Sequence, residues 1–387
     1  MTVKGSKPAI NVREELADLR KPTGLAGEAM LRAETPQEQF QLINAGRKNI
    51  LYNGDFMIAQ RSTSSTTSNY STVDRWKNNM PARYTFSQST DAPDGYSFSM
   101  KADCTATGSD TITLFEQRLE GYDLVQTGFG TNNAKHLTLS FWIKSHQTGT
   151  FTAELYNPTG TDQQISKPYT VNNSGVWEYK TITYPPDTSH GFSSNSSLGL
   201  YLFMWFSAAS SFKSGSLNSD AWSGASNPAR VNSDIPNLSS STDNYVQIAG
   251  VQLELGKVAT PFEHRSYGEE LALCQRYFER RGTDINGWEF IADAGQLTSA
   301  TNYQCAVRFN EQMRVPPTMS VTGTLSNLKI IRAAALVTIT GITASDNTNG
   351  RTLLLYGTCA NSGGSAGEQT RIQTITPGTW VNFDAEL

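Results

Sequence analysis

The stretch VQLELGKVATPFEHRSYGEELALCQRYFERR, residues 251–281, passes from a strand pattern to a helix pattern within a few residues. Apolar and polar residues alternate at its start, which predicts a half-buried strand that ends at Gly256. Pro261 prevents a simple continuation of this strand, because proline has no backbone N–H to donate to a neighbouring strand. The stretch therefore separates a first β-rich domain from a second one.

A helix is predicted directly after the proline, over residues 266–281. Ser266 is followed three residues later by Glu269, a capping box in which both side chains accept hydrogen bonds from free backbone amides. The apolar residues behind this cap recur at helical spacing and form a wide face that needs a partner. That partner is either the chain's own β-domain or, in the interpretation we favour, identical helices of a homotrimer. The residues at the trimer interface would be Leu271, Cys274 and Phe278.

Three stretches together resemble a known family. Residues 251–281 are similar to a junction in many tailed-bacteriophage fibre and other virion-surface proteins, where it follows a jelly-roll module of the carbohydrate-binding type. NILYNGDFMIAQRSTSSTTSNYSTVDRW (49–76) resembles the opening strand of that module, and LTLSFWIKS (137–145) its central strand. RFNEQMRVPPTMSVTG (308–323) resembles a segment of phage fibre tips. The resemblance implies a structural protein of the virion.

The whole chain is expected to be mainly β, with a jelly-roll sandwich and a smaller C-terminal β-domain. Short apolar runs separated by clusters of Gly, Asn, Ser and Pro predict the strands, the first of them over residues 50–61. The N-terminal residues are richer in charge and in helix formers, and two short helices there need a partner such as the virion. The predicted parts are a helical attachment segment (1–48), the sandwich (49–265), a connecting helix (266–282) and a C-terminal tip (283–387).

Composition excludes several classes of protein. Only 17% of the 387 residues are charged and the net charge is −4, so nothing indicates a nucleic-acid-binding surface. The first residues lack the apolar core of a signal peptide, and no apolar run is long enough to span a membrane. The cysteines lie far apart without metal-ligand spacing, so we expect free, buried thiols and neither a metal site nor a cofactor. They are Cys104, Cys274, Cys305 and Cys359.

The sequence predicts binding rather than catalysis. None of the four histidines has a nucleophile motif nearby, and carboxylates in predicted strands cannot be paired from the sequence alone. The resemblance to jelly-roll modules leaves a structural calcium open, with Asp55 or Asp243 as ligands. Flat aromatic side chains that could stack on sugars are the candidate glycan-binding residues, although each could instead pack in a core. These candidates are Trp222, Trp288, Tyr303 and Trp380.

The resulting hypothesis is a homotrimeric tail fibre that attaches to other tail or capsid proteins through residues 1–48 and recognises host surface polysaccharide. It would be made in the host cytoplasm and reside in the virion. Two alternatives stay open: a depolymerase that cuts the polysaccharide, and a capsid or tail decoration or joining protein that has no glycan ligand.

Overall fold

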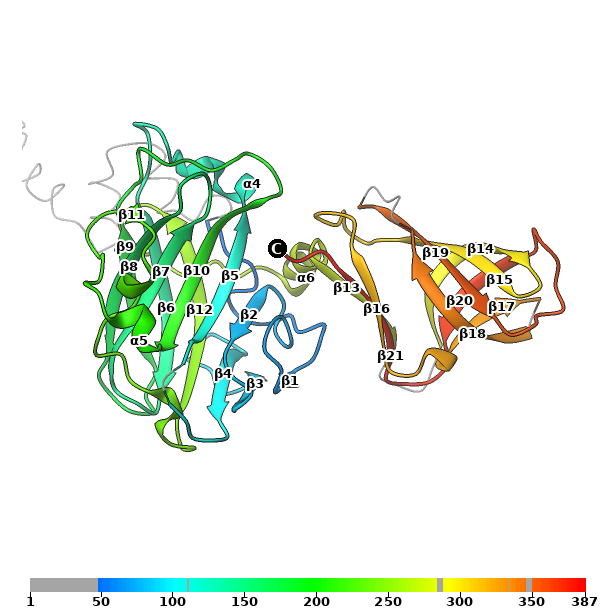
Figure 1. Cartoon of the computed structure of the whole chain (residues 1–387), viewed down its shortest axis with the longest axis horizontal. Helices are drawn as coiled ribbons and strands as arrows, with labels where there is room; N and C mark the ends of the chain where they lie inside the picture. Colours follow the sequence, from blue (N-terminus) through cyan, green and yellow to red (C-terminus); the bar gives the residue numbers. More distant parts are fainter. Residues whose placement is uncertain (1–47, 110, 284–287, 334, 346–349) are drawn as a thin grey trace, which may run out of the picture. The chain divides into compact units, whose positions relative to one another are not determined.

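The structure is a computed structural model that describes residues 48–109, 111–283, 288–333, 335–345 and 350–387. The helices predicted within residues 1–48 lie outside this part of the chain. The described residues are mainly β, as the sequence predicts, and they form a sandwich, a three-stranded sheet and a closed barrel (Figure 1). No helix among them is long and apolar enough to cross a membrane.

The sandwich consists of two six-stranded antiparallel sheets, and this confirms the jelly-roll fold predicted for the first domain. We name each sheet after one of its longest strands. The β12 sheet contains, in order, β1 (Ser64–Ser65), β3 (Tyr84–Ser89), β4 (Ser99–Cys104), β12 (Tyr245–Leu255), β6 (Leu137–Ser145) and β9 (Glu178–Tyr184). The β10 sheet contains β11 (Ser223–Gly224), β8 (Gln163–Val171), β7 (Gly149–Asn157), β10 (Leu198–Ser207), β5 (Thr113–Glu120) and β2 (Trp76–Asn79).

Short helical turns occur in the connections of the sandwich. They are α4 (Gly121–Leu124), η1 (Val125–Thr127), α5 (Ser210–Lys213), η2 (Asn227–Ala229) and η3 (Leu238–Ser240). The last three lie in the polar segment of residues 208–243, which follows β10 and precedes β12.

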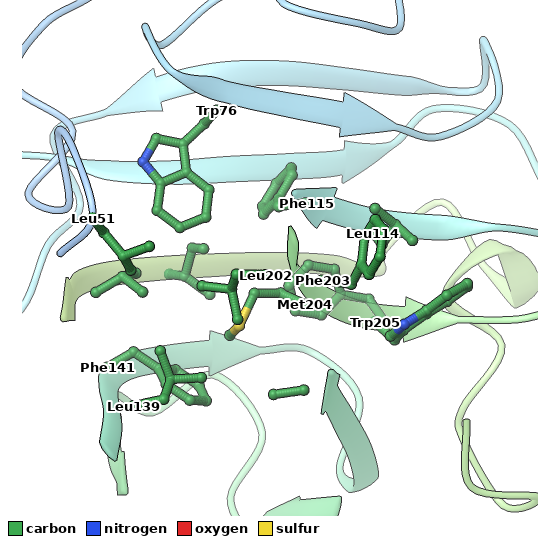
Figure 2. Packing of buried hydrophobic residues seen from close by; sticks show 14 of the residues in the cluster. Leu51, Trp76, Leu114, Phe115, Leu139, Phe141, Leu202, Phe203, Met204 and Trp205 are labelled. Carbon is green, nitrogen blue, oxygen red and sulfur yellow. The ribbon is translucent and has the colours of Figure 1, made fainter. Parts of the chain in front are cut away.

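The core of the sandwich lies between its two sheets, because successive side chains of a strand point to opposite faces. Figure 2 shows Leu202 and Met204 of β10 on the side of Leu139 and Phe141 of β6, and all four side chains are fully buried. Burial of each such side chain contributes roughly 1.5–3 kcal/mol to stability.

The predicted opening strand over residues 50–61 is wrong. Asn53 and Phe56 have positive φ angles of 51° and 60°, which interrupt an extended strand. The Asn53 side chain donates to the carbonyl oxygens of Ile58 and Asp74 and accepts from the Ile58 amide. These hydrogen bonds replace the ladder of a strand, so the segment crosses the sandwich as a folded loop.

The connecting helix is shorter than predicted. Helix α6 spans Tyr267–Gln275, and its capping box between Ser266 and Glu269 is present as the sequence indicates. The chain then turns directly into β13 (Phe278–Thr283), which pairs with a strand near the C-terminus. Tyr277 therefore belongs to the turn and Phe278 to the strand, and neither belongs to the helix.

Two further β-structures follow. The three-stranded sheet contains β13, β21 (Thr379–Asp384) and β16 (Thr318–Thr322) in that order. The closed barrel contains β14 (Glu289–Ser299), β15 (Asn302–Arg308), β19 (Thr352–Cys359), β18 (Ala335–Ala344), β17 (Leu328–Arg332) and β20 (Gln369–Thr374), and η4 (Leu325–Asn327) precedes β17. Both structures share one hydrophobic cluster, which is separate from the core of the sandwich.

Candidate functional site

The outer face of the β10 sheet carries a row of aromatic rings. Tyr201, Phe203 and Trp205 alternate with core residues along β10, so they leave the sheet on the side away from the core. Tyr156 of the neighbouring strand β7 stands opposite Tyr201 in the register. Ring centroids lie 5.6 Å apart for Tyr156 and Tyr201, 5.0 Å for Tyr201 and Phe203, and 6.2 Å for Phe203 and Trp205.

One end of this row is covered and the other is open. Phe212 of α5 packs on Trp205 with 5.5 Å between centroids, and Trp205 is only 1% exposed. Tyr156 and Tyr201 remain half-buried. We call these two residues the tyrosine platform. Because the covered rings support them, the platform is held in a fixed orientation.

A buried ion pair also holds the row in place. Glu154 of β7 is fully buried and accepts hydrogen bonds from Arg230 Nε at 2.9 Å and from Trp205 Nε1 at 2.8 Å. The Arg230 guanidinium lies 5.1 Å from the ring centroid of Tyr156 and 4.9 Å from that of Phe203. Burial raises the pKa of Glu154 to about 7, against the opposing effect of Arg230. The segment after β10 is thereby tied to the sheet at a point next to the platform.

Cationic side chains flank the platform on β5 and β2. Glu116 is 2% exposed, and its Oε1 atom lies 2.9 Å from Arg118 Nε and 3.3 Å from Lys77 Nζ. The Arg118 guanidinium lies 5.1 Å from the ring centroid of Tyr201. Two cations thus share one buried carboxylate, and both cationic side chains keep about a fifth of their surface exposed.

This arrangement suits a flat, hydroxyl-rich ligand. A half-exposed tyrosine ring offers an apolar face to stack on, while hydroxyl, guanidinium and ammonium groups around it form hydrogen bonds. The Tyr156 hydroxyl donates to Asp162 at 2.6 Å, which adds an exposed carboxylate at the edge. Sugar rings combine an apolar face with hydroxyl groups in this way.

The glycan-binding residues predicted from the sequence do not share one surface. Trp222 is half-buried against the sandwich core and donates its Nε1 hydrogen to the Pro185 carbonyl at 2.8 Å. Trp288 precedes the barrel and is 68% exposed. Trp380 of β21 is half-buried beneath the Arg280 guanidinium, 3.9 Å from its ring centroid.

Tyr303 is a wrong candidate. It is 1% exposed inside the barrel, and its hydroxyl donates to the Gly341 carbonyl at 3.1 Å. A ring that is enclosed in the barrel core cannot stack on a sugar.

Two of the predicted trimer contacts are also wrong. Cys274 and Phe278 are 0% and 4% exposed within a single chain, so their surface is already covered. Leu271 is half-buried. The helix and the turn after it are fixed to the chain's own sandwich, since Arg276 binds Glu120 at 2.8 Å. The wide apolar face therefore finds most of its partners inside the protomer.

Among the described residues, no group of three or more His, Cys, Asp and Glu side chains could hold a metal ion. The two potential calcium ligands therefore belong to no such group. Asp55 is 5% exposed, and burial raises its pKa. Asp243 is exposed. All four cysteines are free and buried, as the sequence predicts.

Sequence reasoning missed the platform because β10 gives no alternation signal. Its residues LGLYLFMWFS are apolar on both faces, so the outward rings cannot be distinguished from the core rings. A usable signal was present in the partner strand β7, since Glu154 stands between the apolar residues Ala153 and Leu155.

No family model and no curated protein sequence matches the chain at a significant level. Solved structures similar to it include the enzymatically active domain of bacteriophage CBA120 tailspike protein 4, at 13% identity and a TM-score of 0.29. That match covers 54% of this chain and 21% of the tailspike chain.

Two other similar structures are sugar-binding modules. The xylan-binding domain from Paenibacillus barcinonensis matches at 11% identity and a TM-score of 0.28, over 56% of this chain and 100% of its own. A family 30 carbohydrate-binding module matches at 11% identity and a TM-score of 0.26, over 55% of this chain and 91% of its own. At these scores the similarities assign no function to the chain.

Proposed function

We propose that the sandwich binds carbohydrate on the outer face of the β10 sheet, with Tyr156 and Tyr201 as the stacking surface. The observation that carries this proposal is the contrast within one aromatic row. Trp205 and Phe203 are buried, whereas the two tyrosines at the other end keep part of their surface exposed. A ring that serves only the fold gains more from complete burial. Arg118 and Lys77 would donate hydrogen bonds to hydroxyl or carboxylate groups of the sugar.

The proposed activity is binding without catalysis. A glycosidase needs two carboxyl groups that both reach the sugar, one as an acid and one as a base or nucleophile. Glu154 is fully buried and occupied by Arg230 and Trp205, and Glu116 is enclosed by two cations. Neither carboxylate can approach a bound sugar in this arrangement. A depolymerase would release oligosaccharide from host envelope glycan, and we expect no release.

Affinity electrophoresis tests the binding site. Gels would contain one soluble polysaccharide each: xylan, a mixed-linkage glucan, galactomannan or polygalacturonate. We expect at least one gel to retard the wild-type protein, and the Tyr156→Ala/Tyr201→Ala variant to be retarded clearly less in that gel. Tyr122→Ala is the matched control, because Tyr122 is 58% exposed on α4 and outside the platform. Equal retardation of the platform variant and the wild type would contradict the proposed site.

We also propose that the binding module belongs to a virion protein of a tailed bacteriophage, a homotrimeric tail fibre directed at host surface polysaccharide. Support comes from the resemblance of residues 49–76, 137–145 and 251–281 to phage fibre proteins. Three copies joined rigidly would raise the apparent affinity by roughly 10²- to 10⁴-fold over a single weak site. A decoration or joining protein without a glycan ligand would share the fold but not the binding.

Light scattering and particle assembly test this second part. The full chain should have the mass of three copies in solution, and deletion of residues 1–48 should abolish incorporation into particles while leaving polysaccharide binding intact. A monomeric mass, or normal incorporation of the truncated chain, would contradict the fibre proposal without affecting the binding proposal.

A further inference from the structure

The outer face of the β12 sheet carries a second group of aromatic rings, on the opposite side of the sandwich from the tyrosine platform. Trp142 of β6 stands opposite Tyr179 of β9 in the register, and their ring centroids lie 5.3 Å apart. Tyr179 is 44% exposed and Trp142 is half-buried. Trp177 lies two residues before Tyr179 and therefore on the same face. We call these three residues the edge patch, because β9 is the last strand of its sheet.

A fixed network of polar groups borders the edge patch. Asp91, in the loop after β3, accepts hydrogen bonds from Lys144 Nζ at 2.7 Å and from Gln247 Nε2 at 3.0 Å. Trp177 Nε1 lies 3.4 Å from the same carboxylate. Lys144 also lies over the Trp177 ring, 5.9 Å from its centroid. The Asp91 side chain nevertheless keeps 47% of its surface exposed, so its oxygens remain open to a ligand.

The edge patch is also held in place by the neighbouring residue Tyr96. Tyr96 has a pKa raised to about 12 by burial and by the neighbouring Tyr179, while a hydrogen bond with Trp142 opposes the rise. Its ring packs against the backbone of Gly250, where a Cβ atom would lie 2.5 Å from the ring. Gly250 has a φ of 57° at a bulge in β12. Tyr96, which lies next to Trp142 and Tyr179, therefore rests on a backbone shape that only glycine provides without strain.

The size of the patch argues against a protein partner. Beyond Trp142 and Tyr179, the next outward positions of β6 and β9 are the polar residues Ser140 and Thr181. A stable protein interface buries about 800 Å² on each side, roughly 20–30 residues. Three rings bordered by a lysine, an aspartate and a glutamine are instead on the scale of one or two sugar rings.

We propose that the edge patch is a second carbohydrate-binding site, so that one sandwich binds glycan on both outer faces. The sugar stacks on Trp142 and Tyr179, and its hydroxyl groups hydrogen-bond to Asp91 and Lys144. These atoms belong to the β12 sheet and the loop after β3, and none of them belongs to the tyrosine platform. The edge patch can therefore bind sugar whether or not the platform does.

Isothermal titration calorimetry with hexasaccharides of glucose, xylose, mannose and galacturonic acid tests this proposal. We expect two hexasaccharides per wild-type chain for at least one of these probes. The platform variant Tyr156→Ala/Tyr201→Ala and the patch variant Trp142→Ala/Tyr179→Ala should each bind one. The variant that combines all four substitutions should bind none. Thr181→Ala, on the same face as the patch, is the matched control and should bind two.

Each alternative result separates the two sites. One hexasaccharide per chain, lost only in the platform variant, overturns the edge patch and leaves the platform standing. One hexasaccharide lost only in the patch variant overturns the platform and supports the edge patch. No binding of any probe to the wild type overturns both. Because loss of Trp142 could disturb the sheet, Tyr179→Ala alone is the second variant. Its melting temperature should match that of Thr181→Ala, while binding at the edge patch should weaken at least fivefold.

Discussion

The sandwich and the barrel are both β-structures with a hydrophobic core, but they bury different kinds of side chain. The sandwich contains buried charges that include Asp74, Arg75, Glu116 and Glu154. Among barrel residues whose side chains are described, the buried polar ones are Thr370, Gln373 and Thr374, and none of these is charged.

This difference shows which part of the chain uses buried charges to hold side chains in fixed positions. Taking a charge out of water costs several kcal/mol, and an ion pair recovers this only when its geometry is good. Apolar side chains would therefore give a simpler core, as they do in the barrel. In the sandwich, the Glu154–Arg230 pair fixes a long segment beside Tyr156, and the Glu116 pairs fix Arg118 beside Tyr201. Buried charges and partly exposed aromatic rings occur together on the same face.

The largest effect should follow from breaking a buried ion pair between the sandwich and a residue near the C-terminus. Arg75 is fully buried, contacts Glu386 and lies 3.4 Å from the ring centroid of Tyr277. Glu386→Ala leaves this guanidinium without its carboxylate, and we expect a loss of about 3–5 kcal/mol in the free energy of unfolding, measured by urea denaturation. The matched barrel variant is Glu368→Ala, which removes an exposed pair with Arg332 and should change little. Equal effects of the two variants would contradict the contrast.

The next largest effect should come from the barrel core. Ile372 is fully buried there, and Ile372→Ala should cost about 2–5 kcal/mol through lost contacts and a cavity. Because the barrel and sandwich have separate hydrophobic clusters, calorimetry should show a shift in one melting transition only. Ile143→Ala in the sandwich is the matched variant and should shift the other transition. A common shift in both variants would show that the two cores unfold as one unit.

The third effect should be a dependence of the stability of the sandwich on acid pH, which the barrel does not share. Burial raises the pKa of Asp74 to about 6, above its ordinary value of 3.8. The folded state then holds a proton that the unfolded state has lost, so the stabilisation that Asp74 contributes is fully present below about pH 4 and is lost as the pH rises to 6. The loss is on the order of 3 kcal/mol at about 1.4 kcal/mol per pH unit. Asp74→Asn should flatten this part of the pH profile of the sandwich, whereas the exposed control Asp94→Asn should leave it unchanged.

Much of the fold can be predicted from the sequence, because local patterns determine strands and caps. Strand β12 ends at Leu255, directly before Gly256 as predicted, and the capping box of α6 occurs where Ser266 and Glu269 indicate it. Two errors have local causes as well. Asn53 turns the chain where a strand is predicted, and the helix pattern of residues 277–281 gives way to pairing with β21, a contact about 100 residues away along the chain.

The candidate site could not be predicted in the same way, since it depends on distant contacts. Arg230 reaches Glu154 across 76 residues and Phe212 packs on Trp205, and such contacts decide which rings of the row are covered. Trp222 illustrates the converse error. Its polar neighbours in sequence indicate exposure, but the Pro185 carbonyl and the ring of Phe129 bury much of it.

The most direct measurement compares one tyrosine from each region. Tyr201 of the platform and Tyr356 of the barrel, which is 40% exposed, would each be changed to alanine, and the dissociation constant would be measured for the polysaccharide that best retards the wild type. Loss of a stacking contact worth about 1.4 kcal/mol weakens binding tenfold. We expect Tyr201→Ala to weaken binding about tenfold and Tyr356→Ala to leave it unchanged. An unchanged constant for Tyr201→Ala together with a weakened one for Tyr356→Ala would place the binding surface on the barrel and contradict this account.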